Sequence, residues 1–228
     1  MLEQDWLSAR RLNPALDYEE FKRFWQGAAR PATKRARFPR MMATAFDHPR
    51  TPEEAEIKAL VDQYRQVQAQ EWQMELFKQT RRLADAERTL AGKVTKKALN
   101  DQRVATDKIA WHKDQLARLA SPERHASDAR IFPFWYAPVI VMEEGRRVIR
   151  PMRYHCRANG KPAGYDVKYP GLYNARRDNL EGYWRHLFGR RHAVLVANSF
   201  YENVARHTFE GRELAPGEEP SNLVLHFN

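Results

Sequence analysis

Apolar residues recur at three- and four-residue steps through most of residues 51–123, which is the period of an amphipathic helix. The segment Thr51–Glu54 opens this region with a capping hydroxyl, a proline suited to the first turn and two acidic residues that complement the helix dipole. The first helix should reach about Leu90, a length of roughly 55–60 Å at ~1.5 Å per residue. Gly92 breaks the pattern, Thr95 restarts it, and a Ser-Pro pair ends it. The pattern predicts an antiparallel helical hairpin with many charges on its outer faces, which we interpret as a solvated arm or a partner-binding stalk, with a DNA-contacting arm as the alternative.

Nearer the N-terminus, the pattern predicts one short helix followed by a basic loop. Asp17 and Glu20 have the spacing of a capping box, and the apolar residues that follow, including Phe21 and Trp25, fall on one helical face. This helix should therefore pack on the core. Residues 29–50 are rich in Arg, Lys and Pro, a composition typical of a solvated basic loop.

In the second half of the chain the pattern becomes that of strands. Val139–Met142 and Arg146–Arg150, separated by a Glu-Glu-Gly turn, predict a β-hairpin. His192–Val196 is a continuous apolar run typical of a buried strand, and Asn222–Phe227 predicts a last strand. A helix capped by Asp178 should precede the buried strand. Five apolar residues would share one face of it: Leu180, Tyr183, Trp184, Leu187 and Phe188.

Composition and charge narrow the class of protein. The chain has 228 residues, of which 43% are hydrophobic, enough for one domain with its own core. Its formal net charge of +10 favours a polyanionic partner, nucleic acid before an anionic membrane surface, although a basic protein that binds neither stays open. No apolar run approaches the ~18 residues of a spanning helix, so no membrane association is expected. The single cysteine, Cys156, excludes an internal disulfide and fits a reducing cytoplasm.

Candidate chemistry lies in the last third of the chain. Asn174 and Arg176 precede the predicted helix N-terminus, a position that favours phosphate, although an ordinary cap and turn with a surface Arg is the alternative. Glu202 follows an apolar strand and two aromatic residues, so we expect a partly desolvated carboxyl that carries protons near neutral pH. A strand-end Glu paired with an Arg is the alternative. Cys156 beside His155 has no second Cys or His at zinc-site spacing, and we interpret it as structural.

Three blocks of sequence carry a resemblance to a known family. They resemble the SRAP family, the SOS response-associated peptidases that crosslink to abasic DNA, whose blocks read roughly P-M-R-W, N-A-R-x-E and F-Y-E-W. Tyr154 stands where the family has Trp, Asp178 where it has Glu, and Asn203 where it has the second Trp. The resemblance covers residues 131–228 well and the first fifty loosely. The blocks here are Pro151–Tyr154, Tyr173–Glu181 and Val196–Asn203.

The resemblance implies an α+β fold with a mixed, barrel-like β core. Residues 1–228 would form a single domain, incomplete at both ends, with the helical hairpin at 51–123 as an insertion. It implies a monomeric protein of the DNA damage response, in the cytoplasm at the nucleoid. The protein would bind single-stranded or junction DNA, capture an abasic site covalently and share that active site with an autoproteolytic peptidase activity. No metal or organic cofactor is implied.

The resemblance also assigns roles to individual residues. Glu202 would shuttle protons and Asn174 would orient the nucleophile. Tyr154 would stack near the lesion. Four arginines would hold or line the DNA: Arg40, Arg153, Arg176 and Arg177.

Two departures from the family bear on activity. The family exposes an N-terminal Cys, whose thiol and α-amine close a thiazolidine with the ring-opened abasic sugar. This chain has Leu2, and the late segment that brings a His is missing after Asn228. We therefore expect that Met1 is internal to a longer product that starts Met-Cys. The alternatives are a non-catalytic DNA-binding or scaffold paralogue, and an adaptor that binds a protein partner through the hairpin.

Overall fold

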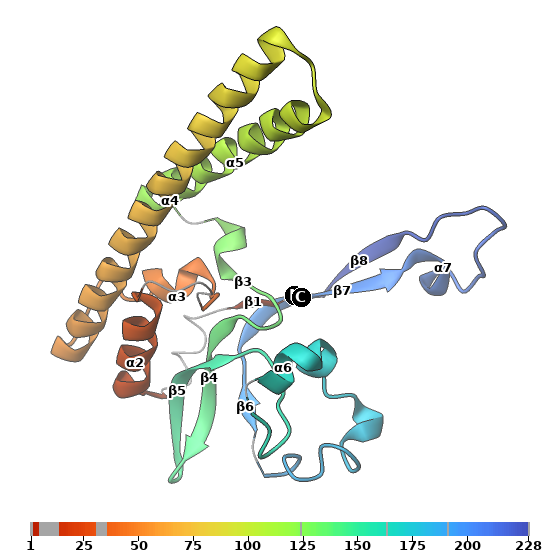
Figure 1. Cartoon of the computed structure of the whole chain (residues 1–228). Helices are drawn as coiled ribbons and strands as arrows, with labels where there is room; N and C mark the ends of the chain where they lie inside the picture. Colours follow the sequence, from red (N-terminus) through yellow and green to blue (C-terminus); the bar gives the residue numbers. More distant parts are fainter. Residues whose placement is uncertain are drawn as a thin grey trace.

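The computed structural model describes residues 2–4, 14–30, 36–123, 125–162, 164–190 and 192–227. Within these residues the strands form two open four-stranded sheets, and two long helices project from them (Figure 1). One sheet has the order β3-β1-β7-β8, with bounds Arg130–Ile131, Leu2–Gln4, Ala197–Ala205 and Asn222–Phe227. The other has the order β2-β5-β4-β6, with bounds Ala15–Leu16, Arg146–Arg153, Tyr136–Glu143 and Ala193–Val194.

The fold is α+β, as the sequence predicts, but the expected barrel-like core is wrong for the described residues. The pairing is mixed, since β2 runs parallel to β5 and the other pairs are antiparallel. Four of the strands have only two or three residues, namely β1, β2, β3 and β6. Strands this short cannot continue the hydrogen bonding around a closed barrel, so the two sheets stay open.

The predicted β4–β5 hairpin is confirmed, and it forms the middle of its sheet. Its register runs from Tyr136 opposite Arg153 to Glu143 opposite Arg146. The two-residue turn holds Glu144 at φ 48° and Gly145 at φ 76°, the left-handed conformations that match the twist of a tight hairpin.

The main hydrophobic core lies between this sheet and the first helices. Helix α2 (Tyr18–Ala28) begins where Asp17 accepts a hydrogen bond from the backbone N–H of Glu20 at 3.1 Å, so the predicted cap is confirmed. α2 contributes Phe21 and Trp25, both fully buried. Helix α3 (Arg40–Thr44) with the turn after it, the start of α4 (Pro52–Gly92) and the β4–β5 hairpin supply the other large members: Met42, Phe46, Ile57, Val61, Ile140 and Ile149.

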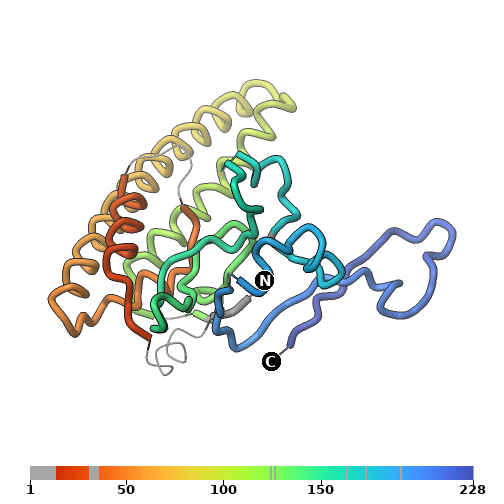
Figure 2. Tube along the Cα trace, turned by 90° about the horizontal axis from the view of Figure 1, so that it is seen from below, coloured from red at the N-terminus to blue at the C-terminus, as the bar shows by residue number. Residues whose placement is uncertain are grey.

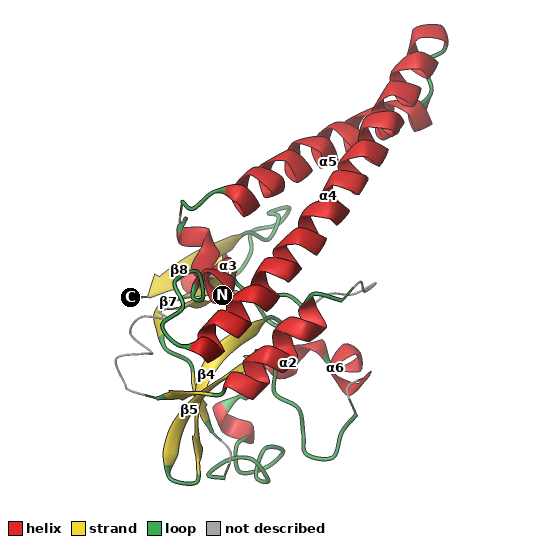
Figure 3. Cartoon of the chain, turned by 90° about the vertical axis from the view of Figure 1, so that its left-hand side faces the viewer, coloured by secondary structure: helices red, strands yellow, loops and turns green. Residues whose placement is uncertain are grey.

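The long helical hairpin is also confirmed, with α4 followed by α5 (Lys96–Ala120). Thr51 and Thr95 cap the two helices by accepting from the backbone N–H three residues on. Figure 3 shows the helices side by side and extending far beyond the sheets. Between them, Arg82 forms an ion pair with Asp101, and Trp72 packs edge-on against Trp111 with ring centroids 5.9 Å apart.

Two sequence predictions in the last third are wrong. Residues 180–190 form a series of turns after the 3₁₀ turn η3 (Arg177–Asn179) instead of the predicted helix. Gly182 weakens a helix there, and of the predicted apolar face only Trp184 is buried, so little packing energy supports one. The predicted buried strand at 192–196 is only β6, an edge strand whose Val194 is 57% exposed.

The last predicted strand, β8, is confirmed and pairs with β7 along its whole length. Seen from two directions, the β7–β8 ribbon and the helical hairpin project away from the rest of the protein in different directions (Figures 1 and 2). None of the helices in the described residues combines the length and the apolar character needed to cross a membrane.

Candidate functional site

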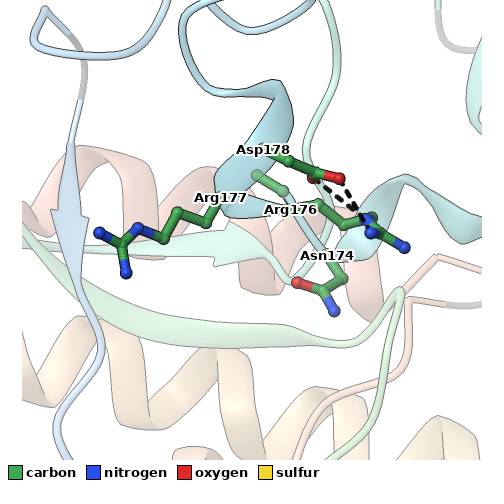
Figure 4. Close-up of a pocket in the computed structure, with 5 residues that line it drawn as sticks. Asn174, Arg176, Arg177 and Asp178 are labelled. Atoms are coloured by element: carbon green, nitrogen blue, oxygen red, sulfur yellow. Dashed lines mark hydrogen bonds and ion pairs between the residues drawn. The ribbon is translucent and has the colours of Figure 1, made fainter.

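The segment from Asn174 to Asp178 lines an open depression of about 680 Å³ at the surface. It follows the 3₁₀ turn η2 (Pro170–Tyr173), and its polar side chains are exposed. Arg176 binds Asp178 through two hydrogen bonds, from Nε to Oδ1 at 3.1 Å and from Nη2 to Oδ2 at 2.9 Å. Arg177 points away from this pair (Figure 4) and forms no ion pair within the described residues.

The Arg176–Asp178 pair sets the electrostatics of the depression. The hydrogen bonds from Arg176 lower the pKa of the Asp178 carboxyl, and the same contact raises the pKa of Arg176. Asp178 is therefore ionised at neutral pH and competes with any phosphate for the guanidinium. The predicted helix N-terminus is missing here, because the three-residue turn η3 has no helix dipole to offer an anion.

The block Pro151–Tyr154, which contains Arg153, is organised by a buried carboxylate that the sequence did not reveal. Asp166, on helix α6 (Gly164–Lys168), is 1% exposed. Arg157 donates to both its oxygens, from Nε to Oδ1 at 2.8 Å and from Nη2 to Oδ2 at 2.6 Å. Arg153 forms an ion pair with the same carboxylate. The Arg153 side chain is 30% exposed, so Asp166 competes with any phosphate for its guanidinium, and the predicted phosphate contact stays a prediction.

His155 completes this Asp166 cluster. Its side chain is 1% exposed, its ring stacks on Phe134 with centroids 4.8 Å apart, and Nε2 lies 3.3 Å from Asp166 Oδ1. This approach lacks hydrogen-bond geometry, so neither ring nitrogen has a hydrogen-bond partner within the described residues. Burial, followed by the charges of Arg153 and Arg157, lowers the pKa of His155. The imidazole is thus neutral at pH 7.

Acidification should destabilise the fold through His155. Because its folded pKa lies below the ordinary value of 6.5, the unfolded chain takes up a proton first as the pH falls. His155 therefore contributes its full stabilisation above the pKa that it has in the unfolded chain. This stabilisation is lost as the pH falls through the pKa that His155 has in the folded protein. The thermal midpoint should therefore drop between about pH 7 and 5, and less steeply in His155→Gln.

A second buried imidazole contributes with the same sign. His112 in the helical hairpin also has a pKa lowered by burial, so the double variant with His112→Gln should have the flattest pH profile. Equal slopes in the parent and the double variant would contradict this account.

Tyr154 and Cys156 flank His155 and are held by the backbone. The Tyr154 N–H donates to the Trp135 carbonyl at 2.7 Å, which extends the β4–β5 pairing by one step. The stacking role expected of Tyr154 stays a prediction. The Cys156 N–H donates to the Leu172 carbonyl at 2.9 Å, and burial raises the pKa of its thiol. A protonated, half-buried thiol is a poor nucleophile, in agreement with the structural interpretation.

Glu202 lies on β7 opposite Leu225 of β8, and its side chain is exposed. The expected desolvation is wrong, because a two-stranded ribbon that projects from the protein leaves both faces open to water. An aromatic pair does lie next to it: Phe200 stacks on Phe227 with centroids 4.6 Å apart. At its other end β7 pairs with β1, where Leu2 lies opposite Phe200, two residues from Glu202.

Arg40 makes its contacts with the residues that follow the helical hairpin. Its Nη1 donates to the Glu123 carbonyl at 3.1 Å and lies 3.2 Å from Asp128 Oδ2, while Nη2 donates to the Ser121 carbonyl. Arg118 of α5 binds the other oxygen of Asp128 at 2.6 Å. Arg40 thus fastens the end of the helical hairpin to the core.

The structure brings some predicted residues together and separates others. Asn174, Arg176 and Arg177 share one depression, whereas Glu202 lies on the β7–β8 ribbon. No hydrogen bond or ion pair within the described residues joins the two. The Asp166 cluster was missed, although one signal was present: Arg, His and Arg at 153, 155 and 157 share the two-residue step of an extended chain.

No family model, curated protein or solved structure matches the chain. Within the described residues, no group of three or more His, Cys, Asp or Glu side chains is arranged to hold a metal ion.

Proposed function

We propose that this chain is a SRAP-type protein of the DNA damage response, which binds single-stranded DNA and captures abasic sites. In this proposal Arg176 and Arg177 hold phosphates at the depression beside Asn174. A covalent adduct forms when a Cys occupies the N-terminus, with Glu202 carrying protons. The peptidase activity of the resembled family would use the same residues.

The observation that supports this proposal most is the pairing of β1 with β7. Leu2 lies in register with Phe200, so the backbone at the position of the family's Cys runs beside the strand that carries Glu202. Glu202 is two positions after Phe200, about 7 Å along a strand. A nucleophile near the start of the chain would therefore lie close to a carboxylate that is far away in the sequence.

The second candidate is a non-catalytic DNA-binding or scaffold protein, and Leu2 favours it. A leucine side chain cannot attack an aldehyde, whereas the basic loop around Arg176 still offers phosphate contacts. Incubation with abasic single-stranded DNA followed by denaturation distinguishes the two. A band that survives denaturation identifies a protein that forms the adduct, and affinity without such a band identifies a binder.

Two substitutions should change DNA affinity in opposite directions. Arg176→Ala removes a phosphate contact, so affinity for single-stranded DNA should fall and the dependence of log K on log salt should become shallower by roughly one unit. Asp178→Asn removes the carboxylate that competes for Arg176, so it should raise affinity and steepen that dependence. Filter binding over a series of salt concentrations measures both. An unchanged slope in Arg176→Ala would remove Arg176 from the phosphate contacts.

A further inference from the structure

The helical hairpin carries its charges unevenly along its length. Residues 52–76, at the base of α4, contain six acidic and two basic side chains. Residues 77–108, which form the far ends of both helices and the turn between them, contain nine basic and four acidic ones. We call residues 77–108 the hairpin tip. The end of the hairpin that lies farthest from the sheets is therefore the positive one (Figure 1).

Cations from both helices meet at the hairpin tip. Lys78, Arg81 and Arg82 of α4 and Lys97 of α5 line one open depression of about 480 Å³, together with Asp85 and Asp101. Lys78 pairs with Glu75 and Arg82 with Asp101. Arg81 and Lys97 form no ion pair within the described residues, and both are exposed. The hairpin tip thus presents charges that the protein itself does not neutralise.

The placement of these cations conflicts with the stability of the helix that carries them. Lys96 and Lys97 occupy the first turn of α5, directly after its cap Thr95, and that turn contains no acidic residue. A helix N-terminus carries partial positive charge, so two lysines there destabilise it. The start of α4 has the opposite and favourable arrangement, with Glu53 and Glu54. A charge that destabilises its own helix without a compensating contact is typical of a binding surface.

The chemistry of the hairpin tip identifies the kind of anion. The hairpin tip contains one aromatic residue, Phe77 at its inner end, so it lacks the series of rings on which successive unpaired bases stack. Duplex DNA offers a dense row of phosphates instead, one charge per ~1.7 Å of its axis. Two adjacent helices, each about 10–12 Å across, are together wider than a major groove of about 12 Å. The tip therefore fits the backbone and not the base edges.

We propose that the hairpin tip binds the phosphate backbone of duplex DNA without reading its sequence. This proposal rests on the proposed function. The tip would bind the double-stranded flank of a DNA molecule whose single-stranded part contacts the core. The hairpin would then act as a second, separate anchor on the same nucleic acid.

The test compares two double variants that remove the same charge. Lys96→Gln/Lys97→Gln changes the hairpin tip, and Lys113→Gln/Arg146→Gln changes two exposed basic residues elsewhere. On undamaged duplex DNA, the tip variant should bind roughly tenfold more weakly and lose about two units of salt dependence, since each lost phosphate contact removes ~0.9. The control should keep the salt dependence of the parent. Equal losses in both would show an effect of net charge alone and would overturn the proposal.

Further variants and another probe separate the remaining outcomes. Arg81→Gln, on the other helix, should also weaken duplex binding. If Arg176→Ala leaves single-stranded binding unchanged while the tip variant loses duplex affinity, the core proposal fails and the tip proposal stands. If Arg176→Ala weakens single-stranded binding while the tip variant keeps its duplex affinity, the tip proposal fails and the core proposal stands.

Vesicles containing phosphatidylserine are the second probe, and a tip-dependent affinity for them without any for duplex DNA would overturn the proposal.

Discussion

Under the proposed function, an N-terminal cysteine should cause this chain to be recovered covalently attached to abasic single-stranded DNA. As the chain stands, with Leu2, no adduct should survive denaturation. With Leu2→Cys and Met1 removed, the α-amine and thiol, with ordinary pKa values of about 8 and 8.5, are both partly nucleophilic at neutral pH. The amine adds to the sugar aldehyde and loses water to give an imine, and the thiol then adds to this imine and closes the thiazolidine. A shift of the DNA band on a denaturing gel measures the product.

Three controls identify the groups that act. Leu2→Ser keeps a small polar residue without a thiol and should form no thiazolidine. Glu202→Gln should slow crosslinking at unchanged DNA affinity, as loss of proton transfer requires. Crosslinking at the parent rate without Glu202 would remove that role from the carboxylate. An adduct abolished by Cys156→Ser would show that the nucleophile is Cys156, not the N-terminal residue.

The largest loss of stability is expected from Asp166→Ala. Its carboxylate is buried, and removing it leaves Arg153 and Arg157 facing each other beside a buried imidazole. Breaking a buried ion pair costs about 3–5 kcal/mol, and partial exposure of the two arginines places this one near the lower end. The thermal midpoint should fall by roughly 5–10 °C for a domain of this size.

The matched control for this substitution is Asp178→Ala, which removes another aspartate held by an arginine. That pair is fully exposed, so its loss should leave the thermal midpoint almost unchanged. Equal midpoints for Asp166→Ala and the parent would show that the two arginines are solvated in another arrangement. The Asp166 cluster would then not fix the chain between β5 and α6.

The helices that could be predicted from the sequence have local signals that agree with their packing. Thr51, Thr95 and Asp17 cap helices where short-range chemistry alone decides the boundary. The pattern at 180–188 has the same periodicity but no packing partner for most of its apolar residues, so periodicity was insufficient there. Burial depends on the whole fold, which is why His192–Val196 has the pattern of a buried strand and yet lies at an edge.

The candidate site was predictable only where neighbours in sequence are neighbours in space. Asn174, Arg176 and Arg177 fall together because one short loop carries them. The partner of Arg153 is Asp166, thirteen residues on, and a sequence alone does not say which arginine a buried carboxylate takes. The exposure of Glu202 depends on the projecting β7–β8 ribbon, which no local pattern encodes.

The pairing of β1 with β7 has a consequence for how the protein is made. Leu2 and Phe200 are joined across almost the whole chain, whereas α4 and α5 contact each other through residues close in sequence. Local contacts form quickly, and closing so long a loop is slow. On the ribosome, the helical hairpin can fold while synthesis continues, but the first strand must wait for β7 to emerge. A chain that ends before β7 would contain the hairpin tip but neither Glu202 nor the β1–β7 pairing.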